Sequence, residues 1–377
     1  MNNGSVSELT RSDYTEFIYD KTCFGDPIDP ESAEDVIEGI SRAIALDSSP
    51  AFQEGLSARL TELGTVCTPE DKDVMLSEIK RRFKELLDKP CPKAIQNWIK
   101  GTTPGITNRQ NNYDLCYALE MDFKQTAVFF QKYFLTMPFN AKSKTDAVFM
   151  YCLYHNRPYV TAQKMLDQTK GFVSQENAHT ATSQIISTIF ETDDDDKFMR
   201  YLSEHCYDNE QQYQLARKII NDEIGTIQKR LLRYESDRIL SPDRLGSLTI
   251  ETLLGFKSQR KGRRSKESVL PKRFTGSLPN DVTLGKIING AEVSYELLRK
   301  TLVLVKFYNF YFEADNTDRN TIAGYLMDFY EELNSVLVSC GFAQLYLRHP
   351  FDCLMLYCAN SYDPIDALYC VMANRRN

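Results

Sequence analysis

The sequence predicts an all-α protein that contains more than one domain. Apolar residues recur at intervals of three and four along most of the chain, which places them on one face of a helix. No run of residues alternates β-branched and polar side chains in the way that marks a half-buried strand. With 377 residues, of which 42% are hydrophobic, the chain is long enough to form two or three cores.

The first predicted helix begins near Pro30, which follows Asp29, a residue type that caps helices. Val36, Ile37 and Ile40 then repeat at the helical spacing. The same spacing predicts further helices over residues 74–87, 122–134, 145–154, 180–190, 211–232, 295–311 and 322–338.

Breaks near Pro138 and in the polar stretch 257–279 divide the chain into five segments. These are an acidic N-terminal helical region (1–70), a short helical domain (71–137), a middle region of helical hairpins (138–256), a basic linker (257–280) and a C-terminal helical domain (281–377). Charge is unevenly distributed among them. Residues 1–50 hold eleven acidic residues against three basic ones, whereas residues 72–109 hold nine basic against four acidic ones. Within a chain of net charge −7, this basic segment indicates either a polyanionic partner or a set of solvated helix faces.

The only tryptophan, Trp98, lies on a short helix that is predicted to follow Pro92. The apolar side chains of this helix share one face, and they are Ala94, Ile95, Trp98 and Ile99. Its polar side chains occupy the opposite face, and they are Lys93, Gln96, Asn97 and Lys100. Two further helices follow, one from near Asn108 and one after Asp122. We therefore expect Trp98 to be a core anchor that fixes the angle at which the polar face projects.

This pattern resembles the lambda-repressor-like helix-turn-helix family over about residues 71–137. The resemblance rests on a short helix ending in I-x-x-W-x-x-G, a loop with proline, and two capped packing helices. It implies that double-stranded DNA is the partner and that the short helix lies in the major groove. There, amide side chains would pair with adenine, lysines would reach guanine or phosphate, and an arginine would bind phosphate. The residues that this places on DNA are Lys93, Gln96, Asn97, Lys100 and Arg109.

A second basic cluster spans residues 257–266 and shows no apolar periodicity. Such a segment is expected to be an exposed loop between domains. We expect Lys261, Arg263 and Arg264 to add contacts to the DNA backbone. The alternative interpretation is a solvated linker without a ligand.

A weaker helix-turn-helix pattern occupies residues 281–308, where Asn289-Gly290 separates two apolar segments. The simpler interpretation is an ordinary αα-hairpin, with Gly290 in the left-handed conformation that ends a helix. Ser294 would then cap the following helix, and Lys300 would be exposed on it.

Motifs of catalysis and of metal binding are not evident, so we expect no catalytic residue, no metal ligand and no cofactor. The tract from Asp193 to Asp196 is interpreted as the cap of a helix rather than as a metal cluster.

Ten scattered cysteines are typical of reduced thiols. No apolar run is long enough to cross a membrane, and the N-terminal residues do not read as a signal peptide, so a cytoplasmic location is expected.

Two functions are favoured, and an enzyme such as a nuclease or recombinase is a third possibility. The first is a DNA-binding regulator of transcription or of a mobile element, prokaryotic or phage-like, whose remaining helices mediate oligomerisation or bind a protein partner through the C-terminal domain. The second is a non-catalytic interaction protein, such as an accessory component of a prokaryotic defence or toxin–antitoxin system, which uses a repressor-like fold to bind protein. A steep salt dependence of binding to duplex DNA would distinguish the first from the second.

Overall fold

The computed structural model describes residues 35–36, 38–39, 51–102, 104, 109–169, 182–206, 209–234, 274, 278–314 and 322–372. These residues form helices joined by turns, and no strand occurs among them. The predicted all-α class is confirmed. Within the described residues, no helix is long and apolar enough to cross a bilayer.

The helices fall into an N-terminal half, residues 51–206, and a C-terminal half, residues 209–372. The N-terminal half contains α3 (Phe52–Glu62), α4 (Lys72–Leu87), α5 (Lys93–Ile99), α6 (Arg109–Ala118), α7 (Phe123–Phe129), the π-helical turn η3 (Phe130–Phe134), α8 (Lys144–Tyr154), α9 (Tyr159–Thr169), α10 (Thr182–Glu191) and α11 (Asp195–His205). The C-terminal half contains α12 (Asn209–Tyr234), α15 (Asp281–Ile288), α16 (Tyr295–Ala314), α17 (Ile322–Ser339), α18 (Pro350–Ala359) and α19 (Pro364–Met372).

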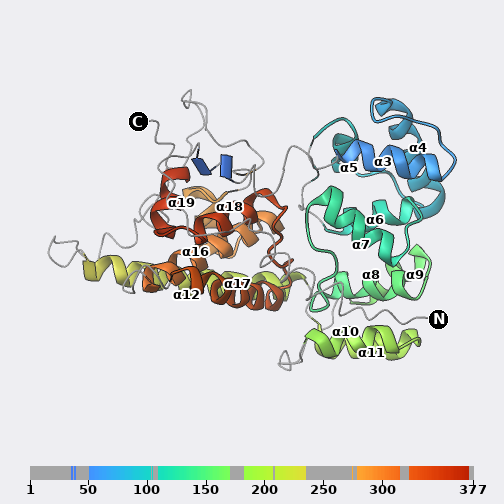
Figure 1. The fold of residues 1–377 in the computed structure, drawn as a ribbon. Coiled ribbons are helices and arrows are strands. Elements are labelled where there is room, and N and C mark those ends of the chain that lie inside the picture. The colour runs from blue at the N-terminus through green and yellow to red at the C-terminus, as the bar shows by residue number, and fades with distance from the viewer. Residues whose placement is uncertain are drawn as a thin grey trace.

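The N-terminal half is a stack of short helices. The group α3, α4 and α5 lies at one end, and the pairs α6–α7, α8–α9 and α10–α11 follow as successive layers (Figure 1). Local sequence explains where several of these helices begin: Asp122 and Gln125 form a capping box on α7, and the side chain of Ser143 caps α8. Apolar residues at helical spacing face inward and form one core from Phe52 to Cys206.

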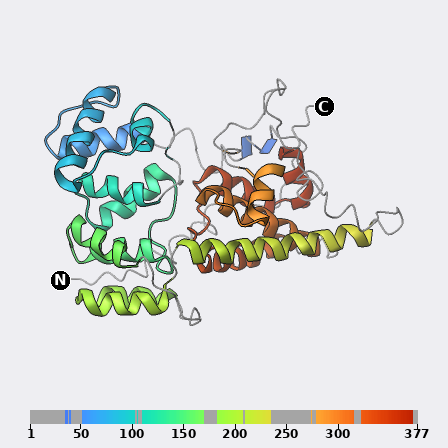
Figure 2. The ribbon, with the colours of Figure 1, turned by 180° about the vertical axis from the view of Figure 1, so that it is seen from behind.

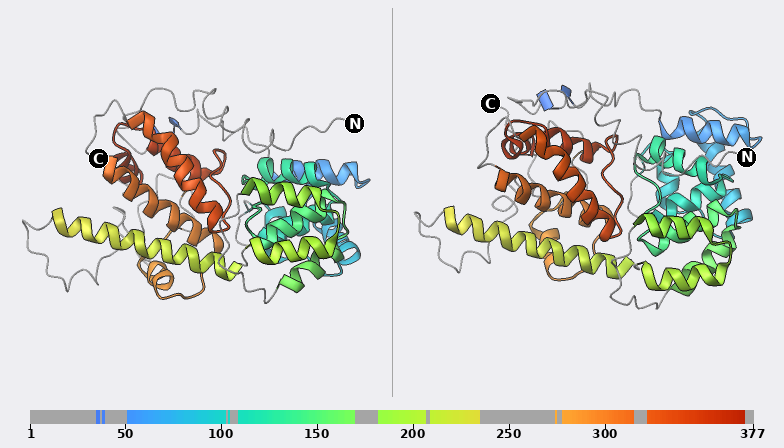
Figure 3. Two further views of the ribbon diagram at one scale, coloured as in Figure 1. Left: turned by 90° about the horizontal axis from the view of Figure 1, so that it is seen from below. Right: turned by 60° about the horizontal axis from the view of Figure 1, so that its bottom comes forward.

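The C-terminal half has a separate core, and the two halves lie side by side (Figures 1 and 2). The long α12 packs along α16 and runs past one side of this group (Figure 3). The turn between α15 and α16 is an αα-hairpin: Gly290 has a φ of +74°, and its amide donates to the carbonyl of Ile287. The expected helix stop is confirmed. Lys300, however, is buried rather than exposed, and its charge is paired with Glu296 at 2.7 Å.

The two cores divide the chain differently from the predicted segments. Tyr113 stacks on Phe149 with ring centroids 4.5 Å apart, so the expected break near Pro138 is not a break in the core. At the other end of the middle segment, Ile220 and Ile224 of α12 belong to the C-terminal core. The structural boundary therefore lies just before α12. Most of the predicted linker lies outside the described residues.

Candidate functional site

The short helix α5 has one buried and one exposed face. Ile95, Trp98 and Ile99 are buried, as their spacing predicts. On the opposite side, Lys93, Asn97 and Lys100 are exposed. These positions are separated by four and three residues, so the three side chains lie in one row along about two helical turns.

Trp98 is the core anchor that its spacing predicts. Its indole packs edge-on against Phe52, with ring centroids 6.1 Å apart, and lies 5.8 Å from the ring of Phe134. The side-chain amide of Gln53 donates a hydrogen bond of 2.6 Å to the carbonyl of Trp98. Because these contacts come from α3 and η3, the axial rotation of α5 is fixed by the core, and so is the direction of its polar row.

The two amide side chains of α5 differ in whether they are free to contact a base. Gln96 is partly buried, and its Nε2 donates a hydrogen bond of 2.8 Å to the carbonyl of Cys91. A bidentate contact between Gln96 and a base would therefore have to break an existing bond. Asn97 is exposed and makes no side-chain hydrogen bond with the described residues. Of the two predicted base-reading residues, Asn97 is the one placed to act without rearrangement.

A fourth polar group adjoins this row. Lys72, at the start of α4, is exposed, and its Nζ lies 3.3 Å from the carbonyl of Lys100. We call Lys72, Lys93, Asn97 and Lys100 together the α5 surface. It carries three cations and no carboxylate, whereas Arg81, further along α4, is bound to Glu78 and Glu85. Lys72 was not among the predicted contacts, because only the fold brings the start of α4 to the end of α5.

The turn that leads into α5 is held by a closed polar network. Nζ of Lys89 lies 2.5 Å from Oδ2 of Asp114 and donates to the hydroxyl of Tyr159 at 2.7 Å. That hydroxyl in turn donates to Oδ1 of Asp114 at 2.8 Å. Burial raises the pKa of Asp114, and the bond to Lys89 acts against that shift. The network ties the α4–α5 turn to α6 and α9.

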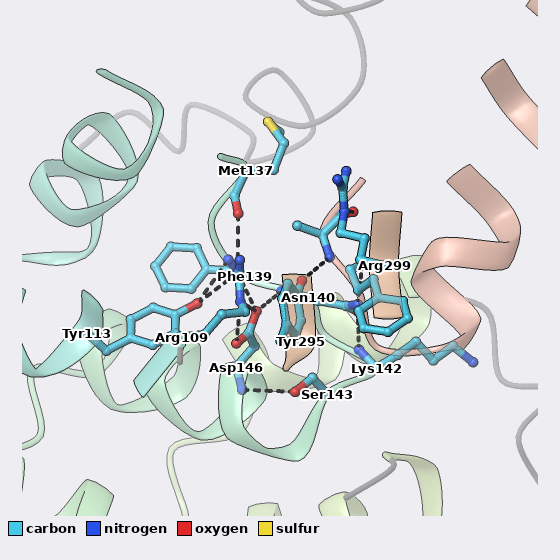
Figure 4. Close-up of polar contacts among 12 residues, drawn as sticks. Arg109, Tyr113, Met137, Phe139, Asn140, Lys142, Ser143, Asp146, Tyr295 and Arg299 are labelled. Carbon is cyan, nitrogen blue, oxygen red and sulfur yellow. Dashed lines mark hydrogen bonds and ion pairs between the residues drawn. The ribbon is translucent and has the colours of Figure 1, made fainter. Parts of the chain in front are cut away.

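The expectation that Arg109 binds a phosphate is wrong. Its side chain is only 7% exposed, and its Nη2 lies 2.6 Å from Oδ2 of Asp146. Its Nε donates to both oxygens of the same carboxylate, and Nη2 also donates to the carbonyl of Met137 at 3.2 Å (Figure 4). Burial lowers the pKa of Arg109, but Asp146, with smaller contributions from Tyr113 and Tyr295, more than offsets this effect, so that the pKa lies well above its ordinary value. Arg109 is therefore a buried structural cation.

The partner in this pair, Asp146, was missed at the level of sequence. It lies in the first turn of α8, where its backbone amide faces the hydroxyl of Ser143, so the pattern reads as an ordinary helix start. Its carboxylate also accepts a hydrogen bond of 2.8 Å from the backbone amide of Asn140. A buried arginine needs such a counter-ion, but the sequence offers several acidic candidates for it.

Three predicted contact residues, Lys261, Arg263 and Arg264, lie outside the described residues.

The acidic tract from Asp193 to Asp196 is placed as expected: the side chain of Asp194 caps α11 by accepting from the amide of Lys197, at 2.9 Å. Arg157 neutralises its neighbours, since it pairs with Asp193 at 2.8 Å and with Asp195 at 3.1 Å.

A groove of about 510 Å³ lies between α12 and the end of α15. Three of its polar lining residues, Glu210, Gln214 and Arg217, are held by contacts within the fold. Arg217 donates to the carbonyl of Ala291 at 2.9 Å, and Gln214 donates to Glu210 at 3.1 Å. The first contact joins α12 to the α15–α16 turn, and the second lies within α12. The acidic lining residues Glu210 and Asp222 balance the basic ones, Arg217 and Lys218. The α5 surface is the stronger candidate for a functional site.

Comparisons with known proteins add no assignment: no family model matches the chain, and no similar curated protein or solved structure was found.

Proposed function

We propose that the protein binds double-stranded DNA through the α5 surface and acts as a regulator of transcription or of a mobile element. The observation that carries this proposal is the outward row Lys93, Asn97 and Lys100 on a helix whose opposite face is anchored by Trp98. An amide flanked by two cations matches a base edge flanked by phosphates.

The dimensions of α5 support the same conclusion. From Lys93 to Lys100 the helix rises roughly 10 Å, which is comparable to the roughly 12 Å width of the major groove of B-DNA. Asn97 lies at the middle of this row, where it would face a base pair. The lysines at its ends would lie near the backbone on either side of the groove.

The roles of the residues follow from their chemistry. The side-chain NH₂ of Asn97 can donate to N7 of adenine, and its Oδ1 can accept from the adenine amino group, so Asn97 would supply specificity. Lys72, Lys93 and Lys100 are compact point charges on flexible stems, so they would mainly bind phosphate and supply affinity for any sequence.

The test is to select duplexes from a random library and then to measure fluorescence anisotropy on a selected and a scrambled duplex across a salt series. Asn97→Ala should weaken binding to the selected duplex by about 1 to 3 kcal/mol and leave binding to the scrambled duplex nearly unchanged. Lys100→Ala should weaken both and flatten the slope of log affinity against log salt by about one unit.

Lys197→Ala is the matched control, because Lys197 is an exposed lysine on α11, at the opposite end of the stack (Figure 1). It should leave affinity and slope unchanged. If no duplex is preferred over any other, the regulator hypothesis fails and binding of a protein partner replaces it.

A further inference from the structure

Side-chain hydrogen bonds connect the two halves of the molecule. Nδ2 of Asn140 donates to the carbonyl of Phe342 at 2.9 Å, and this bond is buried. The hydroxyl of Tyr346 donates to the carbonyl of Gln131 at 3.2 Å. We call these two contacts, with Gln131 and the segments 137–143 and 342–346, the junction.

Each side of the junction is held by its own buried ion pair. In the N-terminal half, Asp146 binds Arg109 and also the backbone amide of Asn140. The Oδ1 of Asn140 accepts from the amide of Lys142 at 2.9 Å, which orients the side chain toward the C-terminal half (Figure 4). The segment that carries Asn140 is therefore held in place by contacts within its own half.

The C-terminal side of the junction is held in the same way. Arg299 pairs with Asp352 at 2.7 Å, and its Nε donates to the carbonyl of Ala343 at 3.0 Å. The amide of Ala343 donates to the hydroxyl of Tyr295 at 2.7 Å. The amide of Tyr346 donates to Asp352 at 3.0 Å. A segment held at this many points moves only when the C-terminal half moves.

The N-terminal side of the junction leads directly to α5. Arg109 is the first residue of α6, and Asp114 on the same helix holds Lys89 in the α4–α5 turn. Helix α6 therefore contacts the junction through Arg109, at its first residue, and the α4–α5 turn through Asp114. Packed side chains and buried ion pairs joined by a rigid helix can transmit a displacement between two sites.

We propose that the junction couples the α5 surface to the C-terminal half, so that the position of the C-terminal half sets the affinity of α5 for DNA. The coupling itself stands on the contacts above, whereas its effect on DNA affinity rests on the proposed function. Asn140 and Tyr346 are positioning residues in this scheme, since neither lies on the α5 surface.

The coupling is tested by thermal unfolding of the full chain, followed in parallel by far-UV circular dichroism and by fluorescence. Trp98 is the only tryptophan and lies in the N-terminal core, so its emission reports that half alone. Circular dichroism reports the helices of both halves. In the wild type, the two midpoints should coincide.

Asn140→Ala combined with Tyr346→Phe removes both bonds across the junction. The two midpoints should then separate by at least about 3 °C, because the halves no longer unfold together. Tyr346→Phe alone should show a smaller separation and serves if the double variant does not fold. Tyr117→Phe is the matched control, because Tyr117 donates to the carbonyl of Arg157 at 3.3 Å within one half. Coincident midpoints in both junction variants would overturn the coupling.

The effect on function is measured on the selected duplex. The junction variants should bind it at least about fivefold more weakly than Tyr117→Phe does, with an unchanged salt slope, because no phosphate contact is lost. Separated midpoints with unchanged affinity would overturn the regulatory role and leave the coupling intact. Absence of DNA binding in the wild type would overturn the proposed function, while the unfolding comparison would still decide the coupling.

Discussion

Replacing Asp146 with alanine would leave the guanidinium of Arg109 buried without a counter-ion. The two side chains are 7% and 1% exposed, so little water can reach the orphaned charge. Breaking a buried ion pair from one side typically costs about 3 to 5 kcal/mol. The backbone amide of Asn140 would also lose its acceptor. We therefore expect Asp146→Ala to fall at the upper end of that range.

A double-mutant cycle separates the charge from the packing. Arg109→Met and Asp146→Leu should each be strongly destabilising, because each leaves one unpaired charge in the core. The double variant should cost less than the sum of the two, since apolar side chains then face each other. Such strong non-additivity is expected only for a pair that is buried and in direct contact.

The assay is urea unfolding at neutral pH, followed by the fluorescence of Trp98, which lies in the core of the same half. A cost below about 1 kcal/mol for Asp146→Ala would refute the reasoning, because that value is typical of a solvent-exposed pair. Arg109 would then be accessible to solvent, and its earlier assignment to a DNA phosphate would stand again.

Three further outcomes are expected. Trp98→Ala should lower the free energy of unfolding by about 3 to 5 kcal/mol, and the wild-type emission should be blue-shifted and protected from quenchers. Burial raises the pKa of Asp352, but Arg299 and His349 together lower it by more, so the folded-state pKa lies below the ordinary value. The stability contributed by Asp352 should therefore be complete above about pH 4 and decline as the pH falls below it, which urea unfolding of wild type and Asp352→Asn at two pH values would measure. Gly290→Ala should cost about 1 kcal/mol, because φ is +74°, whereas Gly285→Ala inside α15 should stabilise by about 0.5 to 1 kcal/mol, as compared by melting temperature.

Helix positions and buried faces could be predicted from the sequence because they depend on local spacing. Trp98 is inside because Ile95 and Ile99 share its face, and no distant partner is needed to deduce that. The end of α15 at Asn289-Gly290 is equally local, since it depends on the conformational freedom of one glycine.

The partners and the burial of the charged residues could not be predicted, because they depend on contacts between residues distant in sequence. Arg109 finds its counter-ion 37 residues away, and Lys89 finds one 25 residues away. Periodicity shows which face of a helix is apolar but not which helix will cover it. For that reason the break expected near Pro138 is absent from the core, while α12 joins the C-terminal half.

The most direct test of the α5 surface is a lysine footprint. The protein is acetylated briefly with and without the selected duplex, and modification at each lysine is quantified by mass spectrometry. The proposal predicts that DNA protects Lys72, Lys93 and Lys100, while Lys164 and Lys197, which are exposed on α9 and α11, remain as reactive as in the free protein. Protection confined to other lysines, with the α5 surface fully reactive in the complex, would contradict it.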